Sequence, residues 1–278
     1  MLDTLPFDYA PVMIVEGHIG AGRHDLRNIA IVIDTGAAGP FPVFVSTRLG
    51  KKLKLIQAPE VLPPPGSSIG ANAPGYRAAR VDRFALGPIA LTNIPVAVTP
   101  VLEGLSANLG HRIDAIVGAT FLHPLTIAID FPGQTIDLAA APGPAAIAQK
   151  LRFAPAKPLI LVTASINGIG PFTMELDTGA SITSLSPAAA KRAGVAITGQ
   201  NLLTGAGGTI TIGTGSATVI SGGITRKLAN VSITAAIDDI ARTAGTPIDG
   251  IIGLDWLHRT RIIIDGPGQR WWVTRPEA

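Results

Sequence analysis

Residues 31–36 read IVIDTG and residues 174–179 read MELDTG, so the tripeptide Asp-Thr-Gly ends two short apolar runs in one chain. An apolar run that stops at Asp and Gly is typical of a strand that breaks into a tight loop. Asp34 and Asp177 therefore occupy equivalent places in two copies of one local structure. We expect a fold with local two-fold symmetry, in which the two loops face each other.

The repeat extends well beyond these loops. Residues 121–134 align with residues 256–269 at an offset of 135, and the same offset joins Asp114 to Asp249. The Asp-Thr-Gly loops themselves lie 143 positions apart, so the two copies differ in length before this region. Self-similarity over such a distance indicates one structural unit written twice.

Residues 139–146 read AAAPGPAA, a run of small residues and proline that is typical of a linker between folded units. We therefore place lobe 1 at residues 1–145 and lobe 2 at residues 146–278. Each lobe has about the length of one ordinary domain.

Short apolar runs bounded by Gly, Pro or Asn predict β-strands in both lobes. They lie at residues 12–19, 29–33, 81–86 and 94–98 of lobe 1, and at residues 159–166, 172–176, 209–212 and 262–264 of lobe 2. Ser186 can cap a short helix that has Pro187 in its first turn and ends at Gly194, and residues 46–50 start the lobe 1 counterpart. Long helices do not alternate with the strands, so the sequence predicts an all-β fold rather than a parallel α/β fold.

The amino-acid composition excludes several classes of protein and of functional site. Hydrophobic residues make up 47% of the chain and charged residues 15%, which allows a sizeable core. No apolar run reaches the ~18 residues of a membrane span. The absence of cysteine excludes disulfides, thiolate metal ligands and a cysteine nucleophile.

Charge and the N-terminus give two further expectations. The net charge is +3, and the basic cluster at Arg48, Lys51, Lys52 and Lys54 has no interleaved aromatic residues, so it indicates a solvated face and no nucleic-acid partner. The first residues lack the basic start and apolar middle of a secretory signal. We expect a cytoplasmic protein, or a periplasmic or secreted one if a leader has been removed.

A pair of facing carboxyl groups has a specific chemistry. Two carboxylates about 3 Å apart cannot both ionise, so they share one proton and their apparent pKa values separate. The ionised group can take a proton from water while the protonated group donates to a carbonyl oxygen, which is general acid–base hydrolysis of an amide. Thr35 and Thr178 can hydrogen-bond across the local axis, and Gly36 and Gly179 let the backbone approach the carboxyl groups closely.

A companion motif follows each aspartate. Residues 114–118 (DAIVG) and 249–253 (DGIIG) each place two apolar residues before Gly, and such a strand can pass beneath the Asp-Thr-Gly loop and support it. With these motifs the sequence resembles the aspartic protease superfamily, in both its pepsin-like and its retropepsin-like branches. Residues 176–181 and 251–257 are especially similar to the retropepsin-type domains of retrotransposons and bacteria.

The resemblance covers nearly the whole chain as two tandem retropepsin-type lobes. It implies a bilobed, pepsin-like β fold with pseudo-two-fold symmetry and a cleft between the lobes. It further implies a monomeric aspartic endopeptidase with Asp34 and Asp177 as catalytic residues, a peptide or protein substrate, and no cofactor. The repeated histidines His123 and His258 lie in different lobes without other ligands at metal-binding spacing, so we expect structural roles for them and no metal.

A flap that covers the cleft is also implied. In lobe 2 it would lie at Gly205, Ala206, Gly207 and Gly208, the tip of a glycine-rich hairpin. The corresponding region of lobe 1, residues 66–76, is longer and proline-rich and is not an obvious hairpin. Pepsin-like enzymes carry a flap tyrosine; Tyr76 is the candidate here, and it either reaches the cleft or packs at the base of the flap.

Two departures from the pepsin-like pattern leave other functions open. Pepsins have Ser or Thr directly after Asp-Thr-Gly, whereas this chain has Ala37 and Ala180; loss of that hydrogen-bond donor raises a carboxyl pKa, so we expect a mildly acidic optimum. The unusual lobe 1 flap allows a protein that only binds peptides, or one that acts on a small molecule. Residues 66–70 (GSSIG) match the Gly-x-Ser-x-Gly elbow of esterases but lack its strand–turn–helix context.

Overall fold

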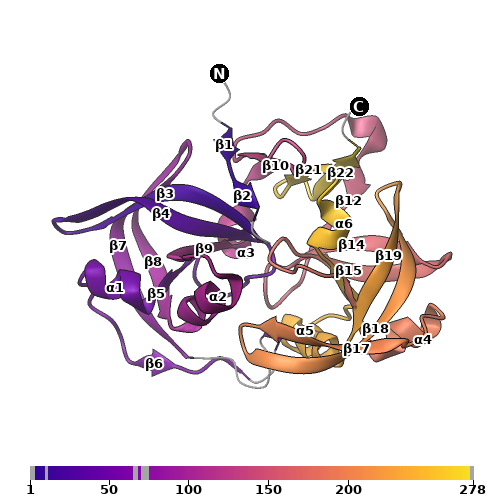
Figure 1. Ribbon diagram of the computed structural model, residues 1–278. Helices are drawn as coiled ribbons and strands as arrows, with labels where there is room; N and C mark the ends of the chain where they lie inside the picture. Colours follow the sequence, from indigo (N-terminus) through magenta and orange to yellow (C-terminus); the bar gives the residue numbers. More distant parts are fainter. Residues whose placement is uncertain (1–3, 10–11, 65–67, 70–74, 276–278) are drawn as a thin grey trace.

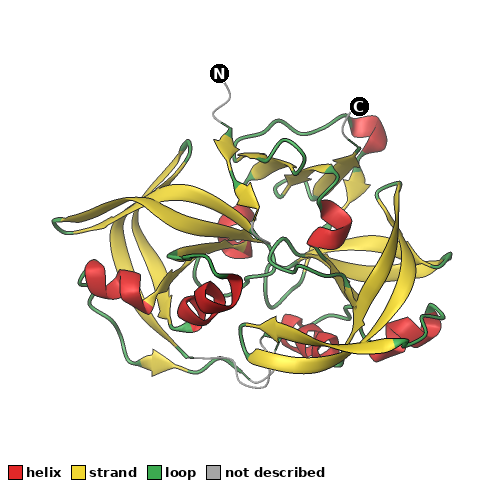
Figure 2. Cartoon of the chain, in the orientation of Figure 1, coloured by secondary structure: helices red, strands yellow, loops and turns green. Residues whose placement is uncertain are grey.

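The computed structural model describes residues 4–9, 12–64, 68–69 and 75–275. It is mainly β, and two lobes lie side by side below a sheet to which both contribute (Figures 1 and 2). The predicted bilobed all-β fold is therefore confirmed. In the described residues, no helix combines the length and the apolar character that crossing a bilayer requires.

Each lobe is built on an eight-stranded sheet. In lobe 1 the strands are β2 (Asp8–Tyr9), β3 (Met13–Ala21), β4 (His24–Asp34), β5 (Val43–Ser46), β6 (Glu60–Val61), β7 (Tyr76–Leu86), β8 (Ile89–Thr99) and β9 (Ala115–Gly118). In lobe 2 they are β13 (Arg152–Phe153), β14 (Ile160–Ile166), β15 (Ile169–Leu176), β16 (Ser184–Leu185), β17 (Gly199–Gly205), β18 (Gly208–Ser221), β19 (Ile224–Ile233) and β20 (Gly250–Ile252).

The two sheets have the same topology. Lobe 1 has the order β2-β3-β4-β9-β5-β8-β7-β6, and lobe 2 has β13-β14-β15-β20-β16-β19-β18-β17. Each sheet also folds back on itself, through pairing of β3 with β7 and of β14 with β18. The sequence repeat is thus a repeat of structure, strand for strand.

A third sheet joins the lobes. Its strands are β1 (Leu5–Pro6), β10 (Thr126–Asp130), β11 (Thr135–Asp137), β12 (Gln149–Lys150), β21 (Arg261–Asp265) and β22 (Arg270–Thr274), in the order β1-β11-β10-β21-β22-β12. At its centre Ala128 lies opposite Ile263, which is its own counterpart at the 135-residue offset. The local two-fold axis therefore passes between β10 and β21.

Helices are few and short. They are α1 (Thr47–Lys52), α2 (Val101–Leu109), α3 (Ala119–Leu122), α4 (Pro187–Arg192), α5 (Ala236–Ala244) and α6 (Leu254–Leu257), with one 3₁₀ turn η1 (Ala145–Ile147). The predicted caps of α1 and α4 are confirmed: the Ser46 hydroxyl accepts from the Leu49 N–H at 3.0 Å and the Ser186 hydroxyl from the Ala189 N–H at 3.1 Å. The helices α2 and α5, which contribute residues to the cavity between the lobes, are not predicted from the sequence.

The core runs through both lobes and the shared sheet. Trp256 and Trp271 are fully buried in it, together with Phe84 and Phe172. The neighbouring Trp272 donates its indole N–H to the Pro144 carbonyl at 2.8 Å. The segment between the lobes is thereby fixed to the shared sheet.

Candidate active site

Each Asp-Thr-Gly loop begins where a strand in the middle of its sheet ends. β4 runs parallel to β9, with Asp34 paired to Gly118. The Ala119 N–H donates to the Ala37 carbonyl at 2.9 Å, and a Cβ at Gly118 would lie 2.1 Å from that oxygen. Only glycine permits this approach, so the apolar-apolar-Gly strand lies against the loop that carries Asp34.

Lobe 2 repeats this support. β15 runs parallel to β20, with Leu176 paired to Ile252. The Leu254 N–H donates to the Ala180 carbonyl at 2.8 Å, as Ala119 does to Ala37. The two loops are therefore held by matching contacts within their own lobes.

Thr35 and Thr178 join the loops across the local axis. The Thr35 N–H donates to the Thr178 hydroxyl at 3.1 Å, and the Thr178 N–H donates to the Thr35 hydroxyl at 2.9 Å. Each hydroxyl then donates across the axis, from Thr35 to the Leu176 carbonyl at 2.6 Å and from Thr178 to the Ile33 carbonyl at 2.9 Å. Both threonines are fully buried, so this network fixes one loop relative to the other.

Replacing either threonine with valine tests this network. Thr35→Val and Thr178→Val each keep the side-chain shape but leave a buried N–H and a buried carbonyl without partners. We expect each change to lower the free energy of unfolding by about 1–3 kcal/mol per unsatisfied group, measured by denaturant unfolding. Thr225→Val, at an exposed position of β19, should stay within about 0.5 kcal/mol of the parent; equal effects at all three sites would contradict this role.

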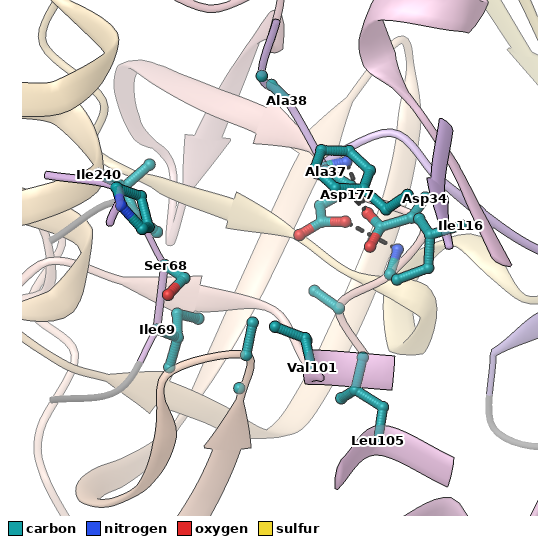
Figure 3. Close-up of a pocket in the computed structure, with 18 of the residues that line it drawn as sticks. Asp34, Ala37, Ala38, Ser68, Ile69, Val101, Leu105, Ile116, Asp177 and Ile240 are labelled. Carbon is teal, nitrogen blue, oxygen red and sulfur yellow. Dashed lines mark hydrogen bonds between the residues drawn. The ribbon is translucent and has the colours of Figure 1, made fainter. Parts of the chain in front are cut away.

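The carboxyl groups of Asp34 and Asp177 face each other between the loops (Figure 3). One oxygen of Asp34 accepts from the N–H groups of Gly36 and Ala37, both at 2.9 Å. One oxygen of Asp177 accepts from the Gly179 N–H at 2.7 Å. Each loop also approaches the acid of the other lobe closely: a Cβ at Gly36 would lie 2.4 Å from the Asp177 carboxyl carbon, and a Cβ at Gly179 would lie 2.4 Å from that of Asp34. The structure therefore brings the two aspartates together.

Burial and mutual repulsion change the acidity of this pair. Burial, followed by the negative charge of Asp34, raises the pKa of Asp177 well above its usual value. Burial also raises the pKa of Asp34, but the N–H groups of Ala37 and Gly36 and the hydrogen bond from Asp177 oppose that rise. The two groups therefore titrate as a pair, which holds one proton between its two apparent pKa values.

The pair lies in a cavity of about 450 Å³ between the lobes. Its walls are mostly apolar, and the strands and helices of both lobes contribute to them. The principal wall residues are Phe41, Phe44, Val61, Leu62, Val101, Leu102, Leu105, Ile116, Leu159, Ile240 and Ile251. The charged residues that line it, within the described part of the chain, are Asp34, Asp177, Glu175 and Lys157.

The glycine-rich segment of lobe 2 forms a hairpin over this cavity. β17 and β18 pair up to Gly205 opposite Gly208, which leaves Ala206 and Gly207 as a two-residue turn. Gly205 and Ala206 line the cavity. The Gly207 N–H donates to the Ile69 carbonyl at 2.9 Å, so the hairpin tip reaches lobe 1 across the cleft (Figure 1).

The described part of the corresponding lobe 1 segment does not form a hairpin over the cavity. β6 has two residues and pairs with the start of β7, Val61 opposite Tyr76. Tyr76 lines the cavity and packs edge-to-face on Phe41, with ring centroids 5.4 Å apart. It therefore both reaches the cleft and packs beside it. Of the esterase-like residues 66–70, only 68–69 are described; Ser68 lines the cavity, and no hydrogen-bond partner is seen for its hydroxyl among the described residues.

Two charged residues that line the cleft, Glu175 and Lys157, are not predicted from the sequence. Glu175 lies two residues before Asp177, but the alternation of side chains along a strand does not tell whether its face meets water or a cleft. Lys157 lies in the loop before β14 and shows no such pattern. Within the residues that are described, no group of three or more His, Cys, Asp or Glu side chains could hold a metal ion.

Comparisons with known proteins agree with this architecture. Residues 15–121 and 162–256, more than half of the chain, match the family model for aspartyl proteases. A comparison with curated proteins finds no match. Among solved structures, the crystal structure of an aspartic proteinase from Irpex lacteus superposes with a TM-score of 0.54 and 13% sequence identity, covering 98% of this chain and 96% of that chain.

The likeness at 13% identity shows the pepsin-like fold alone, whereas the family model matches one segment in each lobe and includes both Asp-Thr-Gly loops. The chain belongs to the aspartyl protease family.

Proposed function

We propose that this protein is an aspartic endopeptidase that hydrolyses peptide bonds with a water molecule activated by Asp34 and Asp177. The observation that carries the proposal is that two carboxyl groups on symmetric loops face each other in the cavity between the lobes, each close to the glycine of the opposite loop. Two facing acids that hold one proton supply a base and an acid at one place. No covalent intermediate is needed.

The two acids take different roles. Asp34, whose oxygen accepts two backbone N–H bonds against one for Asp177, is the base, because such bonds favour the ionised form; it takes a proton from water as the water attacks the carbonyl carbon of the scissile amide. Asp177 donates its proton to the carbonyl oxygen, which gives a neutral tetrahedral diol. Asp34 then gives its proton to the amide nitrogen while one hydroxyl of the diol returns a proton to Asp177. The C–N bond breaks to leave a carboxylic acid and an amine, and the dyad again holds one proton.

The cleft favours an extended peptide. The hairpin of β17 and β18 covers the acids, and its backbone offers hydrogen bonds to a strand bound beneath it, in the manner of β-strand addition. The apolar walls suit side chains on both sides of the scissile bond. We expect the molecule to act as a monomer, because both aspartates come from one chain.

Digestion of a peptide library, followed by mass spectrometry, tests the proposal. We expect internal cleavage that pepstatin inhibits and that the Asp→Asn variants discussed below lack. Tight peptide binding without cleavage would instead identify a peptide-binding protein. Hydrolysis of a small molecule without peptide cleavage would identify a different hydrolase.

The pH profile gives a separate prediction. Activity needs one proton on the pair, so the rate falls as pH drops through the lower apparent pKa of the pair and as pH rises through the higher one. Burial raises both pKa values above the usual aspartate value of about 3.9, so the optimum should be mildly acidic. Measurement of kcat/KM across pH checks this, and a peak below about pH 3 would contradict it.

A further inference from the structure

Glu175 is a buried acid that the proposed mechanism does not use. It lies on β15, is 2% exposed, and lines the cavity that holds Asp34 and Asp177. Its Oε2 atom is buried without a hydrogen-bond partner among the described residues. A buried carboxyl without a partner is destabilising, so this position calls for a group that comes from outside the chain.

The local symmetry shows what is unusual about this position. Glu175 lies opposite Ile251 on β20, and its lobe 1 counterpart, Val32, lies opposite Ile116 on β9. Ile240 of α5 corresponds to Leu105 of α2 at the 135-residue offset, and both line the cavity. The two halves of the cleft therefore share one design, in which a carboxyl group replaces an apolar side chain in lobe 2 only.

The charges around Glu175 favour a cation as its partner. The described charged residues that line the cavity are three acids and one base. The base, Lys157, donates to the Thr243 hydroxyl at 3.0 Å, and no ion pair of 4.0 Å or less joins it to Glu175 among the described residues. An incoming cation would offset the excess negative charge and bind Glu175 through a charge-assisted hydrogen bond.

We propose that Glu175 is a specificity-determining residue, and that the lobe 2 half of the cleft takes a lysine or arginine side chain of the substrate. The proposal rests on the endopeptidase function above. The lobe 1 half, lined by Ile116 and Leu105, takes an apolar side chain. The scissile bond then lies between a basic residue on one side and an apolar residue on the other.

The acidity of Glu175 adds a pH signature to this preference. Burial, then the charges of Asp177 and Asp34, raises the pKa of Glu175 well above its usual value, and Lys157 opposes the rise. The charged residues of α5, Asp238, Asp239 and Arg242, are exposed and face solvent. Glu175 is therefore neutral at low pH, and its preference for a cation should appear only as pH rises and the carboxyl ionises.

Matched peptides test this assignment. They differ at one position beside the scissile bond, where lysine, arginine or the uncharged norleucine stands. For the parent protein we expect kcat/KM to be about 10-fold or more higher for the basic peptides, the scale that one specific pocket contact supplies. This ratio should rise with pH.

Three variants complete the experiment. Glu175→Gln should remove the preference and its pH dependence while norleucine peptides are still cleaved, and Glu175→Val, which copies lobe 1, should favour norleucine. Glu16→Gln removes an exposed charge on β3 and should leave the ratio unchanged. A ratio that is the same in the parent and in Glu175→Gln at every pH would overturn the assignment.

A binding measurement separates this proposal from the proposed function. The same peptides are titrated into Asp34→Asn and into Asp34→Asn with Glu175→Gln, with fluorescence anisotropy as the readout. Tighter binding of basic peptides that needs Glu175 supports the pocket even if the parent cleaves nothing, in which case only the endopeptidase function fails. Equal binding of basic and norleucine peptides to Asp34→Asn would overturn the pocket.

Discussion

Replacing Asp34 or Asp177 with asparagine is expected to lower turnover of a peptide substrate by about 10³-fold or more, toward the upper end of what general acid–base catalysis contributes. Asparagine keeps the size of the side chain but can neither take a proton from water nor hold the shared proton. Because each acid does a different half of the proton transfer, either single change should be as damaging as both together. Initial rates on one good peptide measure the effect.

Asp8→Asn provides the matched control. Asp8 is an exposed acid at the start of lobe 1, and its replacement should leave kcat unchanged. Thermal unfolding of all three variants distinguishes a loss of chemistry from a loss of fold. Full turnover by either Asp34→Asn or Asp177→Asn would end the proposal of a two-acid mechanism.

Gly36→Ala and Gly179→Ala are expected to lower kcat by about 10²-fold or more. A Cβ at Gly36 would lie 2.4 Å from the Asp177 carboxyl carbon, and a Cβ at Gly179 would lie 2.4 Å from that of Asp34. Each added methyl group would therefore push the acid of the opposite lobe out of place. A displacement of about 1 Å at a reacting group is enough for an effect of this size.

Gly104→Ala serves as the control for added bulk. Gly104 lies in α2, and a Cβ there would meet no atom within 4 Å. Activity should be unchanged, and the helix should gain up to about 1 kcal/mol. Comparable loss of activity in Gly104→Ala and Gly179→Ala would show that the effect is not local to the acid pair.

The sequence predicts the strand pattern well because its signals are local. The apolar run that ends at Asp34 and its copy in lobe 2 mark strands and loops through residue type alone, and Ser186 with Pro187 marks the start of α4 in the same way. The repeat then predicts the symmetry. These features depend on residues that are adjacent in the sequence, so the sequence alone is enough to predict them.

The walls of the cleft depend on contacts between distant segments and were harder to predict. In α5 the buried residues Ile237, Ile240 and Ala244 follow helical spacing, and Asp238 and Arg242 lie in the first and last turns, yet the helix is short and sits in an otherwise β context. Its counterpart α2 has no side-chain cap. Only the assembled fold shows that these helices face the acids.

Glu175 is a single residue that shows the same limit of prediction from sequence. In the sequence it is a single charge within an apolar run, which a solvent-facing strand position would explain equally well. Its burial follows from β14, β20 and α5, which come together only in the folded lobe. Patterning along one strand cannot distinguish a face that meets water from a face that meets a cleft.

The shared sheet also determines when, during folding, the two acids can come together. The Thr126 hydroxyl on β10 donates to Asp265 on β21, 139 positions away, so the two halves must both be folded before this ladder closes. Contacts of such long range form late. Under the proposed two-acid mechanism, a chain with only one folded lobe carries a single acid of the pair, and we expect it not to cleave peptides.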